Sequence, residues 1–273
     1  MTMRPFRFAV QSVAQDGSQW LATARRAEEL GYSTLLTADG LHLPSPLPAL
    51  AMAAGATTTL RVGTFVLASP LRHPRLAAWD AHTVSKLSGG RFEFGVGTAR
   101  PEVTQQAAEL TGQPTTGAER LAQAEQMIDE LAALDGDQHT PVLMAASGPK
   151  ARALAAAKAD IITIATGHLT SRAEVARLTA EIREAAGDRA DQVEFIQPIF
   201  IVGEEAPSWT RRFLDADVPT LIANDSLAIL RGTPQQMADE LQRRRDELSA
   251  SYFSFNGVFI DAVAPVVELL AGR

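Results

Sequence analysis

Cysteine is absent from this sequence of 273 residues, so the chain has no disulfide framework, no thiolate metal site and no catalytic thiol. Long hydrophobic runs are also missing, since none approaches the ~18 apolar residues of a membrane span. The first residues, MTMRPFRFAVQS, lack the apolar core and the small-residue cleavage site of a signal peptide. A soluble cytoplasmic protein that does not act at a membrane is therefore expected.

Several kinds of catalytic machinery are missing as well. The formal charge of −7 argues against a nucleic-acid partner, because such partners favour basic surfaces. The five histidines form no H-x-x-x-H pair and no carboxylate cluster has ligand spacing, so we expect no metal site. The signatures of serine hydrolases, P-loop proteins and barrel glycosidases are not found. These absences favour a bound cofactor that carries the chemistry.

What the chain does contain is an alternation of short apolar strands and amphipathic helices, with no break in composition. Strands are expected at 6–13, 33–38, 60–67, 91–96, 141–145, 160–165, 193–202 and 251–256. Eight strand–helix units in this length predict an α/β fold, a single (β/α)8 TIM barrel spanning residues 1–273 as one domain. An open doubly wound sheet is the alternative, although its G-x-G-x-x-G fingerprint does not follow the first strand.

The connections between these elements differ in length. Turns that lead from helix to strand are tight, whereas the segments after the second, fourth and seventh strands are long, at 39–45, 97–116 and 203–232. We expect insertions after strands 4 and 7. In a barrel all such segments emerge at the C-terminal ends of the strands, where active sites lie, so this end is expected to bind a ligand.

The stretch AASGPKARALAAAKADIITIA, residues 145–165, combines an alanine-rich helix with a buried strand. Free N–H groups at a helix N-terminus attract anions, and Gly148 allows close approach of a ligand to the backbone. Pro149 presets the helical φ, Lys150 adds positive charge and the Ser147 hydroxyl can donate. A phosphate site and a plain turn before the helix both remain open on these residues alone.

Four blocks in series resemble the luciferase-like oxidoreductases, the superfamily of bacterial luciferase. They are ARRAEELGYSTLLTAD, ATTTLRVGTFVLASPLRHP, VSKLSGGRFEFGVGTARPE and AASGPKARALAAAKADIITIA. The stretch SGGRFEFGVG is similar to sequences of the branch that uses the 8-hydroxy-5-deazaflavin coenzyme F-420. The resemblance implies a TIM barrel, a flavin-type cofactor (deazaflavin, or alternatively FMN) and pairing into a homodimer.

The resemblance also assigns the cofactor residues. The phosphate would bind at Ala146, Ser147, Gly148, Pro149 and Lys150, and the ring would lie against Gly97, Thr98 and Ala99. A non-prolyl cis peptide is implied at Phe65–Val66, behind the ring. Gly95 and Gly97 are interpreted as removing side chains where the ring would lie, and Arg100 as reaching a phosphate or a substrate anion.

Asp39 stands where the family usually has an acidic residue followed by histidine, but the next residue here is Gly40. We take Asp39 and His42 as the candidate proton donors, with His42 in place of the missing histidine or as an ordinary loop residue. The departure at Gly40 also favours a different hypothesis, a cofactor-binding partner subunit without turnover.

Three further residues are assigned to a small-molecule substrate: Gln11 at the end of the first strand, Arg100 and Trp209. Gln11 can equally be a turn residue, and Trp209 can belong to a local apolar cluster with Phe213. Trp20 and Trp79 have helical spacing to apolar neighbours, so both are expected in the core.

Three functions follow from these observations. The first is hydride transfer by an F-420-dependent oxidoreductase, and the second is an FMN-dependent monooxygenase. The third is the non-catalytic partner, and a barrel isomerase or lyase acting on a phosphorylated substrate is a weaker option.

Overall fold

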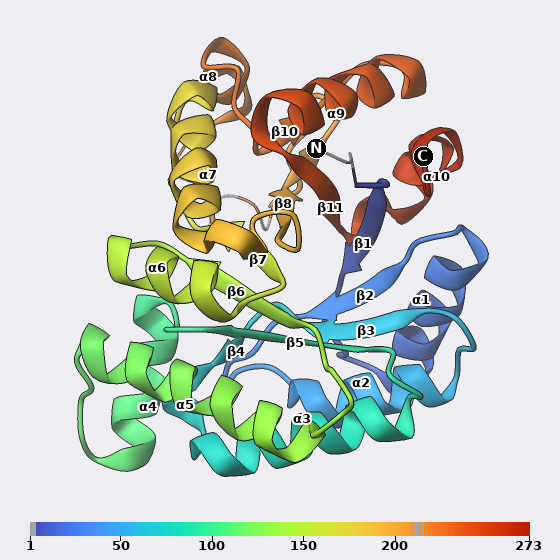
Figure 1. Ribbon diagram of the computed structural model, residues 1–273. Coiled ribbons are helices and arrows are strands. Elements are labelled where there is room, and N and C mark those ends of the chain that lie inside the picture. Colours follow the sequence, from blue (N-terminus) through green and yellow to red (C-terminus); the bar gives the residue numbers. More distant parts are fainter. Residues whose placement is uncertain (1–3, 209, 211–212, 215) are drawn as a thin grey trace.

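The computed structural model describes residues 4–208, 210, 213–214 and 216–273, and its main feature is a closed parallel barrel (Figure 1). Neighbouring strands run in the order β3-β2-β1-β11-β8-β7-β6-β5-β4, and pairing of β3 with β5 closes the ring. The strands are β1 (Arg7–Gln11), β2 (Thr34–Thr37), β3 (Arg61–Thr64), β4 (Leu67–Ala68), β5 (Phe92–Gly97), β6 (Val142–Ala146), β7 (Ile161–Ile164), β8 (Glu194–Ile199) and β11 (Ala250–Asn256). The predicted TIM barrel is confirmed.

Helices surround the barrel, as Figure 1 shows. They are α1 (Gly17–Glu29), α2 (Pro46–Gly55), α3 (Pro74–Leu87), α4 (Pro101–Thr111), α5 (Gly117–Asp135), α6 (Pro149–Lys158), α7 (Arg172–Ala186), α8 (Val218–Ala223), α9 (Pro234–Leu248) and α10 (Ile260–Leu270). Short 3₁₀ turns lie at Ser69–Leu71, Gly187–Arg189 and Gly257–Phe259. Capping boxes start α5 at Thr116 and α9 at Thr233, which fixes where these two helices begin.

Two expected strands are divided in the structure. The stretch 60–67 forms β3 and β4, separated by Phe65 and Val66. The stretch 193–202 forms β8 and then β9 (Ile201–Val202), which leaves the barrel and pairs with β10 (Ile229–Leu230). Both stretches are mostly apolar and β-branched or aromatic, as a single strand would be, so this pattern does not mark either division.

The two tryptophans predicted for the core differ. Trp20 on α1 is only 2% exposed, and its Nε1–H donates to the carbonyl of Ala49 at 2.7 Å, so that prediction is correct. Trp79 on α3 is 59% exposed, so its assignment to the core was wrong. Leu76 and Leu87 on the same helix are also exposed, because the helix buries its alanine-rich face instead.

A carboxylate joins the end of α1 to the loop before β3. Oε1 of Glu28 accepts hydrogen bonds from the N–H groups of Thr58, Thr59 and Leu60, at 2.8, 2.6 and 2.9 Å. Partial burial acts to raise the pKa of Glu28, but these backbone hydrogen bonds outweigh it and lower the pKa to about 2. A carboxylate with a lowered pKa stabilises the fold above pH about 4.5, and this contribution disappears as the pH falls toward 2.

We therefore expect Glu28→Gln to reduce the free energy of unfolding at pH 7 by about 1–2 kcal/mol, after allowance for solvent screening. The difference from wild type should shrink as the pH falls from about 4.5 toward 2, because protonation removes the same charge from wild type. Urea denaturation at several pH values measures this. Glu29→Gln is the control, since Glu29 is exposed and makes only a 3.5 Å ion pair with Arg26. Equal effects of the two substitutions would contradict the prediction.

Candidate functional site

The residues assigned from the sequence meet at the C-terminal end of the barrel. Because all paired strands are parallel, the segments after β1, β2, β4, β5 and β6 emerge at this same end. Gln11 and Gly97 end β1 and β5, and Asp39 and Ser147 lie in the segments after β2 and β6. Below them the barrel is filled by an apolar layer from several strands, so the site lies on a closed core. The layer consists of Ala9, Leu36, Leu143, Ile161, Ile196 and Tyr252.

The N-terminus of α6 is open toward a ligand. Gly148 is its N-cap residue, and no side chain caps the helix. Pro149 follows in the first turn, so the first helical N–H groups belong to Lys150 and Ala151. A Cβ added to Gly148 would meet no atom within 4 Å. An anion therefore has both N–H donors and room here, which fits a phosphate group.

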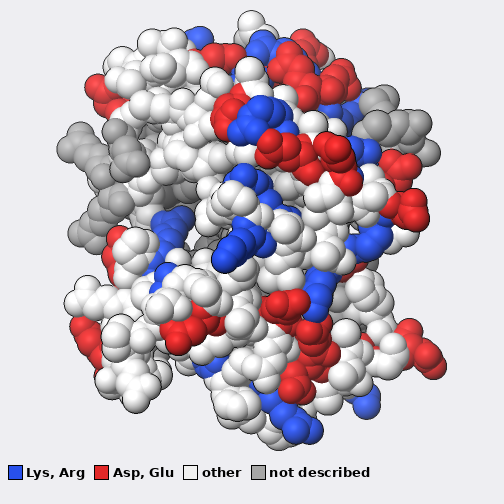
Figure 2. All heavy atoms as spheres, turned by 60° about the vertical axis from the view of Figure 1, so that its left-hand side comes forward, with Lys and Arg blue, Asp and Glu red and all other residues white. Residues whose placement is uncertain are grey.

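Five of the other helices differ from α6 at this point, whereas α2, α3, α4 and α10 also begin without a side-chain cap. Side chains cap α1, α5, α7, α8 and α9, through Asp16, Thr116, Ser171, Asp217 and Thr233. Positive charge lies beside the free end of α6, because Arg152 donates to the carbonyl of Ser147 at 2.6 Å. Figure 2 shows this side of the molecule, with basic side chains toward the middle of the face and acidic ones above and below it.

Small apolar groups from three segments meet at the ends of β5 and β6. The peptide bond between Phe65 and Val66 is cis, as the resemblance implied. A Cβ on Gly97 would lie 2.8 Å from Cγ2 of Val66 and 3.4 Å from Cβ of Ala145. Val66 and Phe65 pack in turn on the apolar layer inside the barrel. The absence of a side chain at Gly97 therefore lets Val66 pack closely against the ends of β5 and β6.

Gly95 has a different role from the one expected. A Cβ at this position would lie 1.7 Å from the carbonyl oxygen of Thr64, so the space is already taken by the neighbouring strand. The hydroxyl of Thr64 donates to the carbonyl of Gly95 at 2.6 Å and accepts from its N–H at 2.9 Å. The interpretation of Gly95 as space for a ring was therefore wrong, because this glycine allows β3 and β5 to approach each other.

The turn after β5 is held by Arg120 of α5, a residue that the sequence did not single out. Ala99 adopts a positive φ of 68°. Nε of Arg120, on α5, donates to the carbonyl of Thr98 at 2.9 Å. Arg100 is exposed, and its guanidinium carbon lies 5.3 Å from the centre of the Phe213 ring. The turn that would face a ring is thus fixed from α5 and contacts the segment after β8.

Asp39 is buried and fully engaged. Its carboxylate accepts from the N–H of Ala68 at 2.9 Å and pairs with Arg72 through two nitrogen atoms, one of them Nη2 at 3.0 Å. This ion pair connects the end of β2 to the segment after β4. A carboxylate in a double contact with arginine is an acceptor that fixes loops rather than a ready proton donor.

His42 is exposed on the same loop, and its ring lies against Gly40. A Cβ on Gly40 would come within 2.9 Å of Cε1 and 3.0 Å of Nδ1 of His42. Gln106 of α4 contacts the ring, with Nε2 3.2 Å from Nδ1. The imidazole therefore occupies the space that a side chain at position 40 would need.

The remaining assignments are less informative. Gln11 is partly buried, and its Nε2 donates to Oγ of Ser254 at 2.6 Å, so it connects β1 to β11 at the C-terminal end of the barrel. Trp209 lies outside the described residues.

Across residues 4–208, 210, 213–214 and 216–273 no group of three or more His, Asp or Glu side chains is placed to hold a metal ion. Within the same residues no helix has the length and apolar character needed to cross a bilayer.

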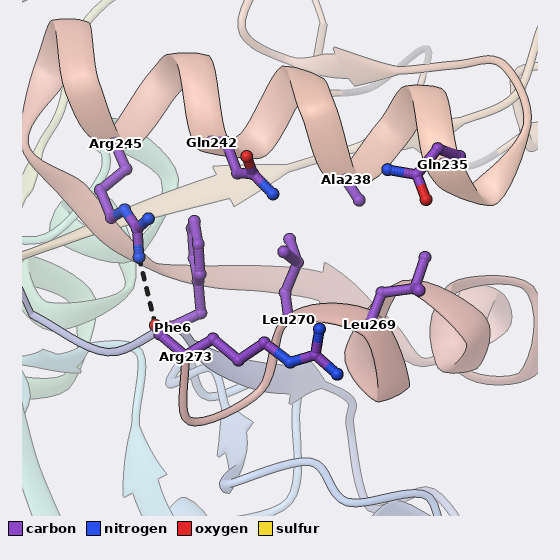
Figure 3. A pocket seen from close by; sticks show the side chains of 8 residues that line it. All are labelled: Phe6, Gln235, Ala238, Gln242, Arg245, Leu269, Leu270 and Arg273. Carbon is purple, nitrogen blue, oxygen red and sulfur yellow. Dashed lines mark hydrogen bonds between the residues drawn. The ribbon is translucent and has the colours of Figure 1, made fainter.

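A cavity of about 200 Å³ lies away from these residues, between α9 and α10 (Figure 3). It is lined by Phe6 at the start of β1, by Gln242 and by Arg245, whose Nη1 donates to the carbonyl of Arg273 at 3.1 Å. This is the N-terminal end of the barrel, where features usually serve stability, so we do not assign the site to this cavity.

Comparisons with known proteins bear on the family and the fold. The family model of the luciferase-like monooxygenases matches residues 2–249. An F420-dependent glucose-6-phosphate dehydrogenase of Beutenbergia cavernae is 31% identical over 171 residues, which cover 51% of this chain and 50% of that protein. The alkanal monooxygenase alpha chain of Photorhabdus laumondii is 32% identical over 102 residues, covering 35% of this chain and 27% of that one. The chain thus spans about half, or less, of these curated relatives.

Among solved structures, an F420-dependent secondary alcohol dehydrogenase in complex with an F420–acetone adduct superimposes with a TM-score of 0.78. The match covers 98% of each chain at 14% sequence identity, so it supports the fold alone.

Proposed function

The chain belongs to the luciferase-like monooxygenase family, and on that premise we propose that it is a coenzyme F420-dependent oxidoreductase acting on a small organic substrate. The observation that carries the proposal is the uncapped N-terminus of α6, with open space at Gly148, at the same end of the barrel as the cis bond Phe65–Val66. The helix N-terminus suits the phosphate of a flavin-type cofactor, and the apolar segment at the cis bond suits its ring. The F420-dependent glucose-6-phosphate dehydrogenase among the relatives supports the choice of a deazaflavin.

In this proposal Ser147, Gly148, Lys150 and Arg152 hold the anionic tail of the cofactor, together with the backbone of Ala146 and Pro149. The bound deazaflavin would supply a two-electron hydride carrier. The chain contributes orientation and exclusion of water, because Val66 and the apolar layer beneath it close the barrel below the ring. Thr98 and Ala99 would contact the ring edge, in a turn that Arg120 holds in place.

Substrate would bind above the ring, among the segments after β2, β5 and β8. We assign His42 as the group that donates a hydrogen bond to it, because the ring is exposed and replaces the side chain missing at Gly40. Asp39 acts through Arg72 by fixing the loops around His42, so it is a positioning residue. Gln11, Arg100 and Trp209 stay our candidates for further substrate contacts.

An FMN-dependent monooxygenase is the second candidate, and the alkanal monooxygenase alpha chain among the relatives favours it. The phosphate site and the ring surface would serve FMN in the same way. The two cofactors differ in the part of the tail beyond the phosphate, which the deazaflavin coenzyme extends further. Positive charge at Lys150 and Arg152, beside the tail, supports the more anionic cofactor.

A titration tests the proposal. Purified protein is mixed with coenzyme F420 or with FMN, and binding is followed by cofactor fluorescence. We expect saturable binding of F420 and weaker binding of FMN. Tight binding of FMN alone would favour the monooxygenase, and absence of binding of either would contradict both. Binding of F420 without hydride transfer to any of a panel of alcohols and carbonyl compounds would favour a non-catalytic partner subunit.

Ser147→Asp should weaken F420 binding by about 10- to 100-fold, or about 1.4–2.8 kcal/mol, because a carboxylate would face the cofactor phosphate. Ser45→Asp is the matched control: it places the same charge at the N-terminus of α2, whose N-cap Ser45 makes no side-chain capping bond. Fluorescence titration of both variants gives the two affinities. An unchanged affinity in Ser147→Asp would show that the phosphate does not bind there.

We also propose that the protein forms a homodimer through α3. Leu76, Trp79 and Leu87 expose 56%, 59% and 80% of their surface on this helix, and such apolar side chains are commonly covered by a partner. The family to which the chain belongs pairs its barrels through helices, so a second copy is the partner we expect. The mass in solution, measured by sedimentation at several concentrations, tests this.

A further inference from the structure

The imidazole of His42 is held by a residue of another element, Gln106 of α4. The side-chain oxygen Oε1 of Gln106 accepts from the backbone N–H of Leu41 at 2.9 Å. The nitrogen Nε2 of the same amide lies 3.2 Å from Nδ1 of His42. One side chain therefore contacts both the backbone and the ring of the loop that follows β2.

These two contacts determine which way the amide faces. A backbone N–H can only donate, so the Gln106 atom facing Leu41 must be the oxygen. The NH₂ group then faces His42, and because an amide NH₂ can only donate, Nδ1 of the imidazole must accept. A neutral imidazole that accepts at Nδ1 carries its proton on Nε2.

Gly40 leaves the room that the ring occupies. Cε1 and Nδ1 of His42 would lie 2.9 and 3.0 Å from a Cβ on Gly40, so only glycine at position 40 lets the ring rest there. Val103, one turn before Gln106 on α4, lies 3.6 Å from the same Cβ position. The carboxylate of Asp39 is engaged by Ala68 and Arg72 in its own contacts.

We propose that Gln106 is a positioning residue that keeps Nδ1 of His42 an acceptor, so that the neutral imidazole carries its proton on Nε2. Nε2–H is thereby an N–H donor, suited to an acceptor oxygen of the substrate, such as the oxygen of a carbonyl or hydroxyl group. The role toward substrate rests on the proposed function, whereas the state of the ring depends only on Leu41, Gln106 and Gly40.

The state of the ring is measurable in the protein without cofactor. Nitrogen-15 NMR of the histidine side chains, at pH about 8 where an ordinary imidazole is neutral, distinguishes a protonated Nε2 from a protonated Nδ1. We expect the proton of His42 on Nε2 in wild type. In Gln106→Glu both oxygens only accept, so the carboxylate should draw the proton to Nδ1, and the Nε2–H signature should be lost.

Gln105→Glu is the matched control. Gln105 is the exposed neighbour on α4 and donates to Glu109, so the variant adds the same charge one residue away without facing His42. It should leave the proton on Nε2. A proton on Nδ1 in wild type would overturn the proposal, as would equal spectra of the two variants. The wild-type measurement stands even if Gln106→Glu fails to fold.

The outcome is separate from that of the cofactor titration. If F420 and FMN both fail to bind while wild type carries the proton on Nε2 and Gln106→Glu alone loses it, the proposed function falls and the role of Gln106 as a positioning residue stands. If F420 binds and the ring carries its proton on Nδ1, the role of Gln106 falls and the cofactor site stands.

Discussion

Gly95→Ala is expected to lower the free energy of unfolding by at least about 4 kcal/mol, enough to prevent soluble expression of many domains. The added methyl group would lie 1.7 Å from the carbonyl oxygen and 2.8 Å from the carbonyl carbon of Thr64. Both are backbone atoms, so no side-chain rotation can relieve the contact. The strands β3 and β5 would have to separate, and the two hydrogen bonds between Thr64 and Gly95 would be lost.

Chemical denaturation, or the soluble fraction where the variant does not fold, measures this effect. Gly55→Ala is the control: Gly55 is the exposed last residue of α2, and a Cβ there meets no atom within 4 Å. Because alanine favours helix over glycine, that variant should match wild type or gain up to about 1 kcal/mol. A Gly95→Ala protein with the denaturation midpoint of wild type would refute the contact.

The barrel itself could be predicted from the sequence, because it depends on repeated local signals. Strands, helix starts such as Thr233-Pro234, and tight turns before strands each have a residue pattern of their own. The order of the segments then places their C-terminal ends together. The break at Phe65–Val66 has no such pattern, because an apolar run looks the same whether it is one strand or two.

The sequence could place the candidate residues at the C-terminal ends of the strands, but it could not show which side chains contact them. Asp39 and His42 were recognised as residues at the end of a strand. Arg72, Arg120 and Gln106, which hold the loops of the site, come from distant segments and form their contacts only after the chain has folded. Gly95 was misread for the same reason, since a glycine leaves no trace of which neighbour requires it.

The contacts at the N-terminal end of the barrel could not be predicted from the sequence either. Four charged side chains from different strands meet there. Glu93 on β5 pairs with Arg7 and, at 2.9 Å, with Arg61. The second acid, Glu194, lies 2.7 Å from the other nitrogen of Arg7. The hydroxyl of Tyr252 donates to Glu93 at 3.1 Å. The two acids are almost fully buried, so their charges depend on the arginines.

The pKa shifts of Glu194 and Arg7 differ in their causes and indicate how well each charge is compensated in the cluster. Burial raises the pKa of Glu194, although Arg7 acts to lower it. Burial acts to lower the pKa of Arg7, but Glu93, Tyr252 and Glu194 outweigh it and raise the pKa. An acid with a raised pKa destabilises the fold once it ionises. The contribution of Glu194 to the free energy of unfolding therefore falls as the pH rises above about 4.5. Glu93 is therefore the main partner of both arginines.

Glu93→Gln should accordingly lower the free energy of unfolding by about 3 kcal/mol, because it removes an almost fully buried carboxylate and leaves two partly buried guanidinium groups without their counter-charge. In this variant Arg7 still pairs with Glu194, whereas Arg61 has lost its acidic partner. Adding Arg61→Met to Glu93→Gln should therefore recover part of the lost free energy of unfolding. Glu181→Gln, which breaks an exposed pair with Arg177 on α7, should change stability by less than about 0.5 kcal/mol. Urea denaturation of the four proteins at pH 7 gives these differences. A loss in Glu93→Gln no larger than that in Glu181→Gln would mean that the cluster is as well solvated as a surface pair.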